Sequence, residues 1–115
     1  MKEAIGDKVR LSHIRDSVRL IREFVEGATF EDFRQNAMMF SACVRHFGII
    51  GEASSRVTEE LRAKHPEVAW SMMTGMRNIV IHKYFGIDEM VLWQTIEQDL
   101  PVLEKQVEAI LQELT

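Results

Sequence analysis

The segment from Arg77 to Tyr84 holds a guanidinium, an amide, an imidazole and the only tyrosine of the chain within eight residues. The planar guanidinium of Arg77 suits phosphate oxygens. The imidazole of His82 can exchange protons near neutral pH, since its ordinary pKa is about 6.5. The apolar residues between them fit a helix packed on a core, whereas Arg77, Asn78, His82 and Tyr84 are not needed for packing. The segment therefore indicates a site for phosphate chemistry.

The spacing within a helix would divide these polar residues between two faces. Asn78 and His82 lie one turn apart on one stripe, and Arg77 and Tyr84 lie together on another. At about 100° per residue, Arg77 and His82 diverge by about 140°. Two copies of the helix around a two-fold axis would close this gap, because each copy would contribute groups to a shared cleft. The pattern therefore favours a homodimeric site.

Each residue also has an ordinary structural interpretation. Arg77 alone fits a surface cation whose stem covers apolar surface, and His82 alone fits a hydrogen-bonded histidine. Tyr84 fits a core ring with an exposed hydroxyl. The combination of all three, with Asn78 placed to orient His82, favours the functional interpretation.

Composition predicts a single globular domain over residues 1–115, with 46% hydrophobic and 28% charged residues. A net charge of -4 argues against a protein that coats nucleic acid through a broad basic face, so any contact with RNA must be local. No apolar run approaches the roughly 18 residues of a membrane span. The lone Cys43 and the absence of a secretory signal at the N-terminus predict the cytoplasm.

Other familiar chemistries are not predicted. The four histidines show no paired metal-ligand spacing, and Cys43 has no second cysteine nearby, so we expect neither a metal nor a cofactor. The sequence also lacks a glycine-rich phosphate loop and a Gly-x-Ser-x-Gly elbow.

Apolar periodicity predicts an all-α fold, an up-and-down bundle of about four main helices. The first helix follows a cap at Asp7, and the second begins at the Thr29 cap and runs to Lys64. The third begins at Pro66 and ends before Gly86, and the fourth follows a cap at Asp88 and is kinked or divided at Pro101.

The second of these helices would be unusually long, since roughly 34 residues span on the order of 50 Å. We therefore expect it to bend near Gly48 and Gly51. A partner subunit that covers part of it is the alternative, because glycines also let two helix backbones approach closely. A bent helix that also serves a dimer combines the two.

Arg77-Asn78-x-x-x-His82-x-Tyr84 resembles the Arg-x(4-6)-His signature of HEPN-domain ribonucleases, in the form found in HepT toxins. The resemblance covers nearly the whole chain. The flanking segments that carry it are Ile49-Ile50-Gly51-Glu52-Ala53, 61–70, 75–78 and Tyr84-Phe85-Gly86-Ile87-Asp88.

The resemblance implies a HEPN-like helical homodimer with the motif at the subunit cleft, and metal-independent cleavage of RNA. His82 and Arg77 would be catalytic, with Asn78, Lys83 and Tyr84 in support and Glu52 as a further cleft candidate. For Glu52, a cap or a salt bridge within its own helix is the other interpretation. The implied partner is an MntA-type minimal nucleotidyltransferase antitoxin, which would silence the toxin by adding AMP to Tyr84.

Two functions of other classes compete with the toxin ribonuclease. One is a non-catalytic HEPN module that binds a nucleotide or its nucleotidyltransferase partner through the same motif. The other is a purely structural helical dimer, which the acidic charge and the small-residue stripe Ser71, Thr74 and Gly75 would suit.

Overall fold

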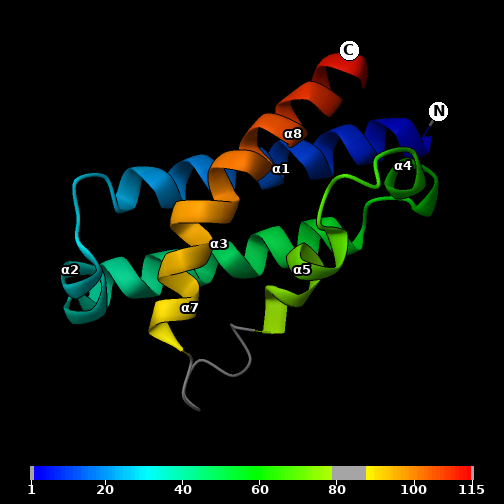
Figure 1. Cartoon of the computed structure of the whole chain (residues 1–115). Helices are drawn as coiled ribbons and strands as arrows, with labels where there is room; N and C mark the ends of the chain where they lie inside the picture. The colour runs from blue at the N-terminus through cyan, green and yellow to red at the C-terminus, as the bar shows by residue number, and fades with distance from the viewer. Residues whose placement is uncertain (1, 79–87, 115) are drawn as a thin grey trace.

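The computed structural model describes residues 2–78 and 88–114, and throughout these ranges the regular structure is helical. This confirms the all-α bundle predicted from the sequence (Figure 1). The elements are α1 (Lys2–Phe24), α2 (Phe30–Gln35), α3 (Ala37–Ser55), α4 (Glu59–Lys64), α5 (Trp70–Gly75), α7 (Glu89–Gln94), the π-helical segment η1 (Thr95–Asp99) and α8 (Leu100–Leu114).

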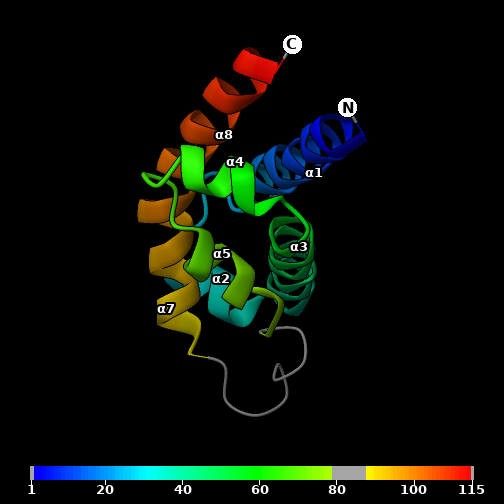
Figure 2. The same ribbon diagram turned by 90° about the vertical axis from the view of Figure 1, so that its right-hand side faces the viewer.

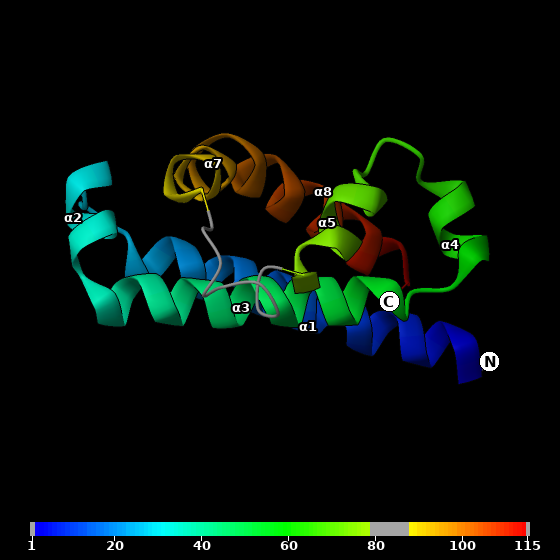
Figure 3. The same ribbon diagram turned by 90° about the horizontal axis from the view of Figure 1, so that it is seen from below.

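Three long rods form the body of the molecule. α1 and α3 lie side by side and run in opposite directions, and α7, η1 and α8 form one continuous rod that crosses them (Figures 1 and 2). Viewed from below, α2 lies at one end of α3, α4 lies beyond the other end, and α5 packs on the C-terminal half of α3 (Figure 3). The described part of the predicted third helix, α5, therefore lies against α3.

The core forms where the apolar stripes of the three rods meet. Burial of each large aliphatic or aromatic side chain contributes about 1.5–3 kcal/mol, so these stripes hold the rods together. The residues at the centre of this core are fully or almost fully buried: Leu11, Ile14, Val18 and Ile21 of α1, Phe47 and Ile50 of α3, and Leu103, Val107 and Ile110 of α8.

The prediction of one long second helix is wrong, because the helix is first interrupted at Asn36. Thr29 starts α2 as predicted: its Oγ1 accepts from the Asp32 N–H at 3.1 Å, and its own N–H donates to Asp32 Oδ2 at 3.0 Å. Asn36 then leaves the helix at φ -90° and ψ 99° and caps α3, accepting from the Met39 N–H at 3.0 Å. Asparagine offers the backbone this alternative to helix continuation.

A second break follows α3, which runs without interruption through Gly48 and Gly51. The expected bend at these glycines is therefore wrong, and the chain turns instead at Arg56 and Thr58. An unbroken helix of about 50 Å would also exceed the longest extent of the molecule, 45 Å.

Asp7 fixes this second turn, so its predicted role as the cap of the first helix is wrong. α1 begins earlier, at Lys2, and Asp7 is buried in its interior. The carboxylate accepts from the Thr58 N–H at 2.9 Å and from the Thr58 hydroxyl at 2.7 Å. Thr58 in turn caps α4, accepting from the Leu61 N–H at 3.3 Å. One buried acid thus ties α1 to the turn between α3 and α4.

The ends of the remaining helices match the sequence pattern in part. α4 ends at Lys64 as expected, but the next helix begins at Trp70 instead of Pro66. Residues 66–69 form a turn over which the Trp70 indole N–H donates to the His65 carbonyl at 2.9 Å. Asp88 caps α7 as predicted, whereas the expected end at Gly86 lies outside the described residues.

Pro101 lies in the first turn of α8, and the rod of α7, η1 and α8 is helical on both sides of it, so the last helix is not divided there. A proline within a helix has no N–H to donate and its ring crowds the carbonyl four residues earlier. The preceding five residues, Thr95–Asp99, widen into a π-helical turn in which the Leu100 N–H donates to the Thr95 carbonyl. The wider turn lets the rod continue past the proline.

Candidate functional site

Arg77 and Asn78 follow α5 directly, and both side chains are exposed. Two methionines anchor this end of α5: Met73 within the helix is fully buried, and Met76, its C-cap, is almost fully buried. Met73 and Met76 therefore belong to the core. Because Met76 immediately precedes Arg77, the buried methionine fixes the point from which the arginine leaves the core.

The backbone of Arg77 lies directly against Gly51 of α3. A β-carbon added at position 51 would lie 2.2 Å from the Arg77 backbone N, 2.8 Å from its Cα and 2.7 Å from its Cβ. Such separations are far inside van der Waals contact, so only glycine permits this approach of the two backbones. The glycine serves a contact within one chain, where the sequence interpretation offered a bend or a partner helix.

Glu52 follows Gly51 and brings its carboxylate to Arg77. Its Oε2 lies 4.0 Å from Arg77 Nη1, and its Oε1 accepts from Arg56 Nε at 3.0 Å. All three side chains are about half exposed, so these ion pairs add little to stability. Glu52 thus forms the predicted salt bridge at its own helix, with Arg56, and also lies beside Arg77, while its place in a cleft stays a prediction.

The other predicted site residues, His82, Lys83 and Tyr84, lie outside the described residues. The distance from Arg77 to His82, and the faces that they share with Asn78 and Tyr84, therefore stay predictions. The polar stripe that leads to them is described: Ser71 and Gly75 are exposed and Thr74 is half-buried. The Thr74 hydroxyl oxygen is shielded from solvent and has no hydrogen-bond partner among the described residues.

Other reactive side chains serve the fold. Burial raises the pKa of the Cys43 thiol to about 12, so it stays protonated and unreactive at neutral pH. His46 Nδ1 lies 3.0 Å from the hydroxyl of Ser17, but Ser17 is buried and beyond reach of a substrate. Burial, and then the charge of Arg45, lowers the pKa of His46 and keeps it neutral.

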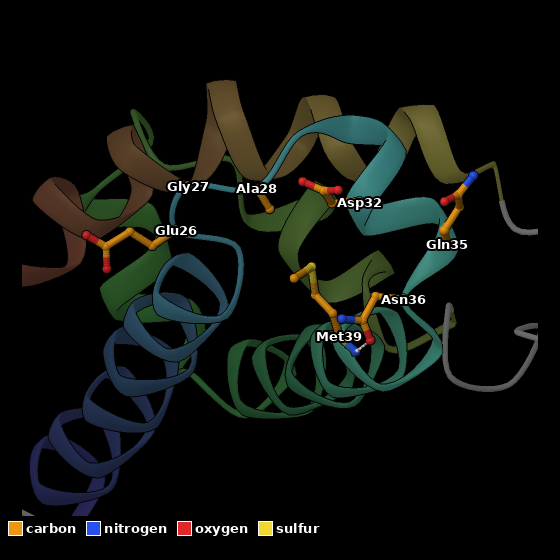
Figure 4. A pocket seen from close by; sticks show the side chains of 7 residues that line it. All are labelled: Glu26, Gly27, Ala28, Asp32, Gln35, Asn36 and Met39. Atoms are coloured by element: carbon orange, nitrogen blue, oxygen red, sulfur yellow. Dashed lines mark hydrogen bonds between the residues drawn. The ribbon is translucent and has the colours of Figure 1, made fainter.

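A groove of about 500 Å³ lies at the other end of α3 from Arg77 (Figure 4). Its carboxylates, Glu26 and Asp32, would repel phosphate. Asp32 and Asn36 already cap helices. The groove therefore belongs to the α1–α2–α3 connections, and its lining residues are Glu26, Gly27, Ala28, Asp32, Gln35, Asn36 and Met39.

Two general features of the described ranges bear on the kind of site. Within residues 2–78 and 88–114, no group of three or more histidine, cysteine, aspartate or glutamate side chains is placed to hold a metal ion. No helix in the same part of the chain is long and apolar enough to cross a membrane.

Comparison with known proteins identifies the class of this helical chain. The family model described as Ribonuclease HepT-like matches residues 14–110, a range that includes α3, Arg77 and the whole segment to Tyr84. The chain belongs to the HepT-like ribonuclease family. This confirms the resemblance seen in the sequence motif.

Individual relatives align with this chain along most of their length. A protein of Caldanaerobacter subterraneus subsp. tengcongensis with the name "Putative RNase" is 43% identical over 102 residues, which cover 89% of this chain and 91% of the relative. One of Methanocaldococcus jannaschii with the same designation is 41% identical over 103 residues, 90% of this chain and 94% of the relative. A "Probable ribonuclease HepT" of Thermococcus cleftensis is 39% identical over 100 residues, 87% and 91% of the two chains. No solved structure matches the chain.

Two structural roles in the site do not follow from the sequence interpretation. Arg56 is not among the predicted site residues, although its position four residues after Glu52 is a signal for an ion pair. Gly51 is predicted to allow a bend, and nothing in its sequence context indicates that the Arg77 backbone packs against it. That contact depends on the placement of α5 on α3.

Proposed function

We propose that this protein is a metal-independent endoribonuclease in which Arg77 and His82 carry the chemistry. The observation that carries the proposal is the placement of Arg77: an exposed guanidinium whose backbone is held against α3, at the start of the family motif. Because the arginine is already held in place, it can neutralise the charge that develops on a phosphate without first losing conformational freedom.

RNA supplies its own nucleophile, the 2′-hydroxyl. His82 removes the proton of this hydroxyl or delivers a proton to the departing 5′-oxygen, because an imidazole titrates near working pH. Arg77 stabilises the phosphorane through its non-bridging oxygens. Asn78 holds the imidazole or the phosphate, and Lys83 and Tyr84 position the strand. The products are a 2′,3′-cyclic phosphate and a 5′-hydroxyl end, and no step requires a metal ion.

The same proposal includes assembly and control. Two copies form a homodimer whose cleft joins Arg77 of one copy with His82 of the other, as the helical spacing favours. The protein acts in the cytoplasm as the toxin of a toxin-antitoxin pair. A minimal nucleotidyltransferase of the MntA type transfers AMP to Tyr84, and the added anion repels RNA from the cleft.

RNA cleavage in EDTA tests the nuclease. Purified protein should cut a single-stranded RNA, and Arg77→Ala and His82→Ala should cut it at least 100-fold more slowly while keeping the circular dichroism spectrum and sedimentation mass of the wild type. Equal cleavage by all three proteins would remove the nuclease proposal. It would leave the second candidate, a non-catalytic module that binds its partner or a nucleotide through the same motif.

Separate measurements test assembly and control. Sedimentation mass at micromolar concentration should be that of two chains, and the mass of a single chain would exclude the shared cleft. Incubation with ATP and the nucleotidyltransferase should add the mass of AMP to the wild type but not to Tyr84→Phe. An unchanged wild-type mass would exclude the AMP switch.

A further inference from the structure

The Glu52 bridge consists of Arg56, Glu52 and Arg77, with one guanidinium on each oxygen of a single carboxylate. Arg56 Nε donates to Oε1 at 3.0 Å, and Arg77 Nη1 lies 4.0 Å from Oε2. Arg56 caps the C-terminal end of α3, whereas Arg77 follows α5. Two cations that are 21 residues apart in sequence are thus brought together beside the start of the motif.

Within residues 2–78 and 88–114, most hydrogen-bond donors of these two arginines have no protein acceptor. Each guanidinium carries five N–H donors. Among the described residues, Arg56 spends one of them on Glu52, and the 4.0 Å separation from Arg77 is too long for a hydrogen bond. The Arg56 side chain is 57% exposed and that of Arg77 is 50% exposed. A planar donor set is therefore presented to solvent by each arginine.

The charge balance of the bridge favours an anion. Two guanidinium groups and one carboxylate leave one net positive charge. An exposed ion pair four residues apart on a helix is weak, whereas a bidentate bond from a guanidinium to a phosphate is both charge-assisted and oriented. A phosphate can therefore accept hydrogen bonds from the N–H groups of Arg56 that Glu52 leaves free, while Glu52 keeps the two cations close together.

We propose that Arg56 is an RNA-binding residue that holds a backbone phosphate next to the one at Arg77, with Glu52 as the positioning residue between them. This rests on the proposed ribonuclease function and extends it to the substrate: a single strand of at least two successive phosphates. RNA is favoured over an acidic protein partner because the second cation of the bridge is the motif arginine itself. Arg56 contacts the strand away from the reacting phosphate, so it governs affinity and not the chemical step.

The test compares Arg56→Ala and Arg56→Lys with Arg34→Ala. Arg34 is a matched control, because it is also an exposed arginine paired with one glutamate of its own helix, Glu31. It lies on α2, at the other end of α3 from Arg56 (Figure 3). The measurements are KM and kcat for cleavage of a single-stranded RNA, and the salt dependence of binding of the same RNA, with a fluorescent label, in the His82→Ala background.

Arg56→Ala should raise KM and the RNA dissociation constant about 5–10-fold, with kcat within about twofold of the wild type. The slope of log affinity against log salt should shrink by about 0.7, which corresponds to one phosphate contact on a single strand. Arg56→Lys should bind RNA more tightly than Arg56→Ala but less tightly than the wild type, because lysine keeps the charge but lacks the planar guanidinium that can bind a phosphate with two N–H groups. Arg34→Ala should change KM less than twofold.

Equal KM values and salt slopes for Arg56→Ala and Arg34→Ala, in a protein that cleaves RNA, would overturn this inference alone. Loss of nucleotidyltransferase binding with unchanged RNA affinity would overturn it in favour of a protein contact. A wild type that neither cuts nor binds RNA would remove the ribonuclease proposal together with this inference.

Discussion

Gly51 and Arg77 are in backbone contact: a β-carbon at position 51 would lie 2.2 Å from the backbone N of Arg77. α3 therefore sets the position of the motif arginine directly, without an intervening side chain. Glu52, the next residue of α3, then meets the guanidinium end of the same arginine. Gly51 thus positions the backbone of Arg77, and Glu52, the next residue of the same helix, lies beside its guanidinium.

Gly51→Ala should separate α5 from α3 and displace Arg77. Crowding of this kind costs about 1–3 kcal/mol of stability, and a displacement of about 1 Å at a catalytic group can cost up to about 100-fold in rate. We expect a lower melting temperature and at least a tenfold loss of kcat/KM for RNA cleavage.

Gly6→Ala is the matched control for this substitution. Gly6 is helical too, within α1, but a β-carbon there would meet nothing within 4 Å. It should keep full activity and gain up to about 1 kcal/mol from higher helix propensity. Equal activity of the two alanine variants would contradict the positioning role of Gly51.

Asp7→Ala should destabilise the protein by about 2–3 kcal/mol, because it removes a buried acceptor of two hydrogen bonds from Thr58. Chemical denaturation measures this change. Asp16→Ala is the control, since Asp16 lies on the same helix and is 58% exposed. A loss below about 0.5 kcal/mol for Asp7→Ala would show that the tie to the α3–α4 turn is dispensable.

Acid should weaken the contact between α1 and α8 through Glu104. Burial acts to raise the pKa of this carboxyl, but hydrogen bonds from Arg22 and Arg19 outweigh it and lower the pKa below its ordinary value. The ionised form therefore stabilises the folded state at any pH above the unfolded pKa of about 4.3. That stability is lost as the pH falls through the lower folded pKa.

Glu104→Gln should thus cost about 1 kcal/mol at pH 7 and flatten the decline in the free energy of unfolding between about pH 5 and pH 3. Glu97 is exposed and lies on the same rod as Glu104, so Glu97→Gln should retain the wild-type decline. Parallel pH curves for wild type and Glu104→Gln would contradict this assignment.

Cys43 should resist alkylation in the folded protein. Burial removes it from solvent and raises the pKa of its thiol to about 12. Iodoacetamide at pH 8 should therefore add mass only after denaturation, and cleavage of RNA should be unaffected by the treatment. Rapid modification of the native protein would contradict the burial of Cys43 in the core.

The sequence predicted those parts of the fold that depend on local chemistry. The Thr29 and Asp88 caps were found because a side-chain oxygen near a new apolar period is a strong helix signal. The apolar periodicity also predicts the buried face of the first helix, where Leu11, Ile14, Val18 and Ile21 repeat at helical spacing and are fully buried.

Features that depend on contacts distant in sequence were not predictable in the same way. Asp7 has the local signature of a cap, but its partner is Thr58, 51 residues later. Gly51 has the signature of a bend, but its neighbour is Arg77. The prediction of one long helix is wrong at Asn36, because the Asn36 side chain competes locally with helix continuation. The apolar periodicity continues across that break and therefore does not reveal it.

The most direct test of the central claim is single-turnover cleavage, in EDTA, of an RNA oligonucleotide, alongside the same strand with a 2′-deoxy residue at the cleavage position. The account predicts that wild-type protein cuts the RNA to a 2′,3′-cyclic phosphate and a 5′-hydroxyl and leaves the deoxy strand intact. Arg77→Ala and His82→Ala should slow the cut by at least 100-fold. Cleavage of the deoxy strand, a 3′-hydroxyl product, or undiminished rates in both variants would contradict it.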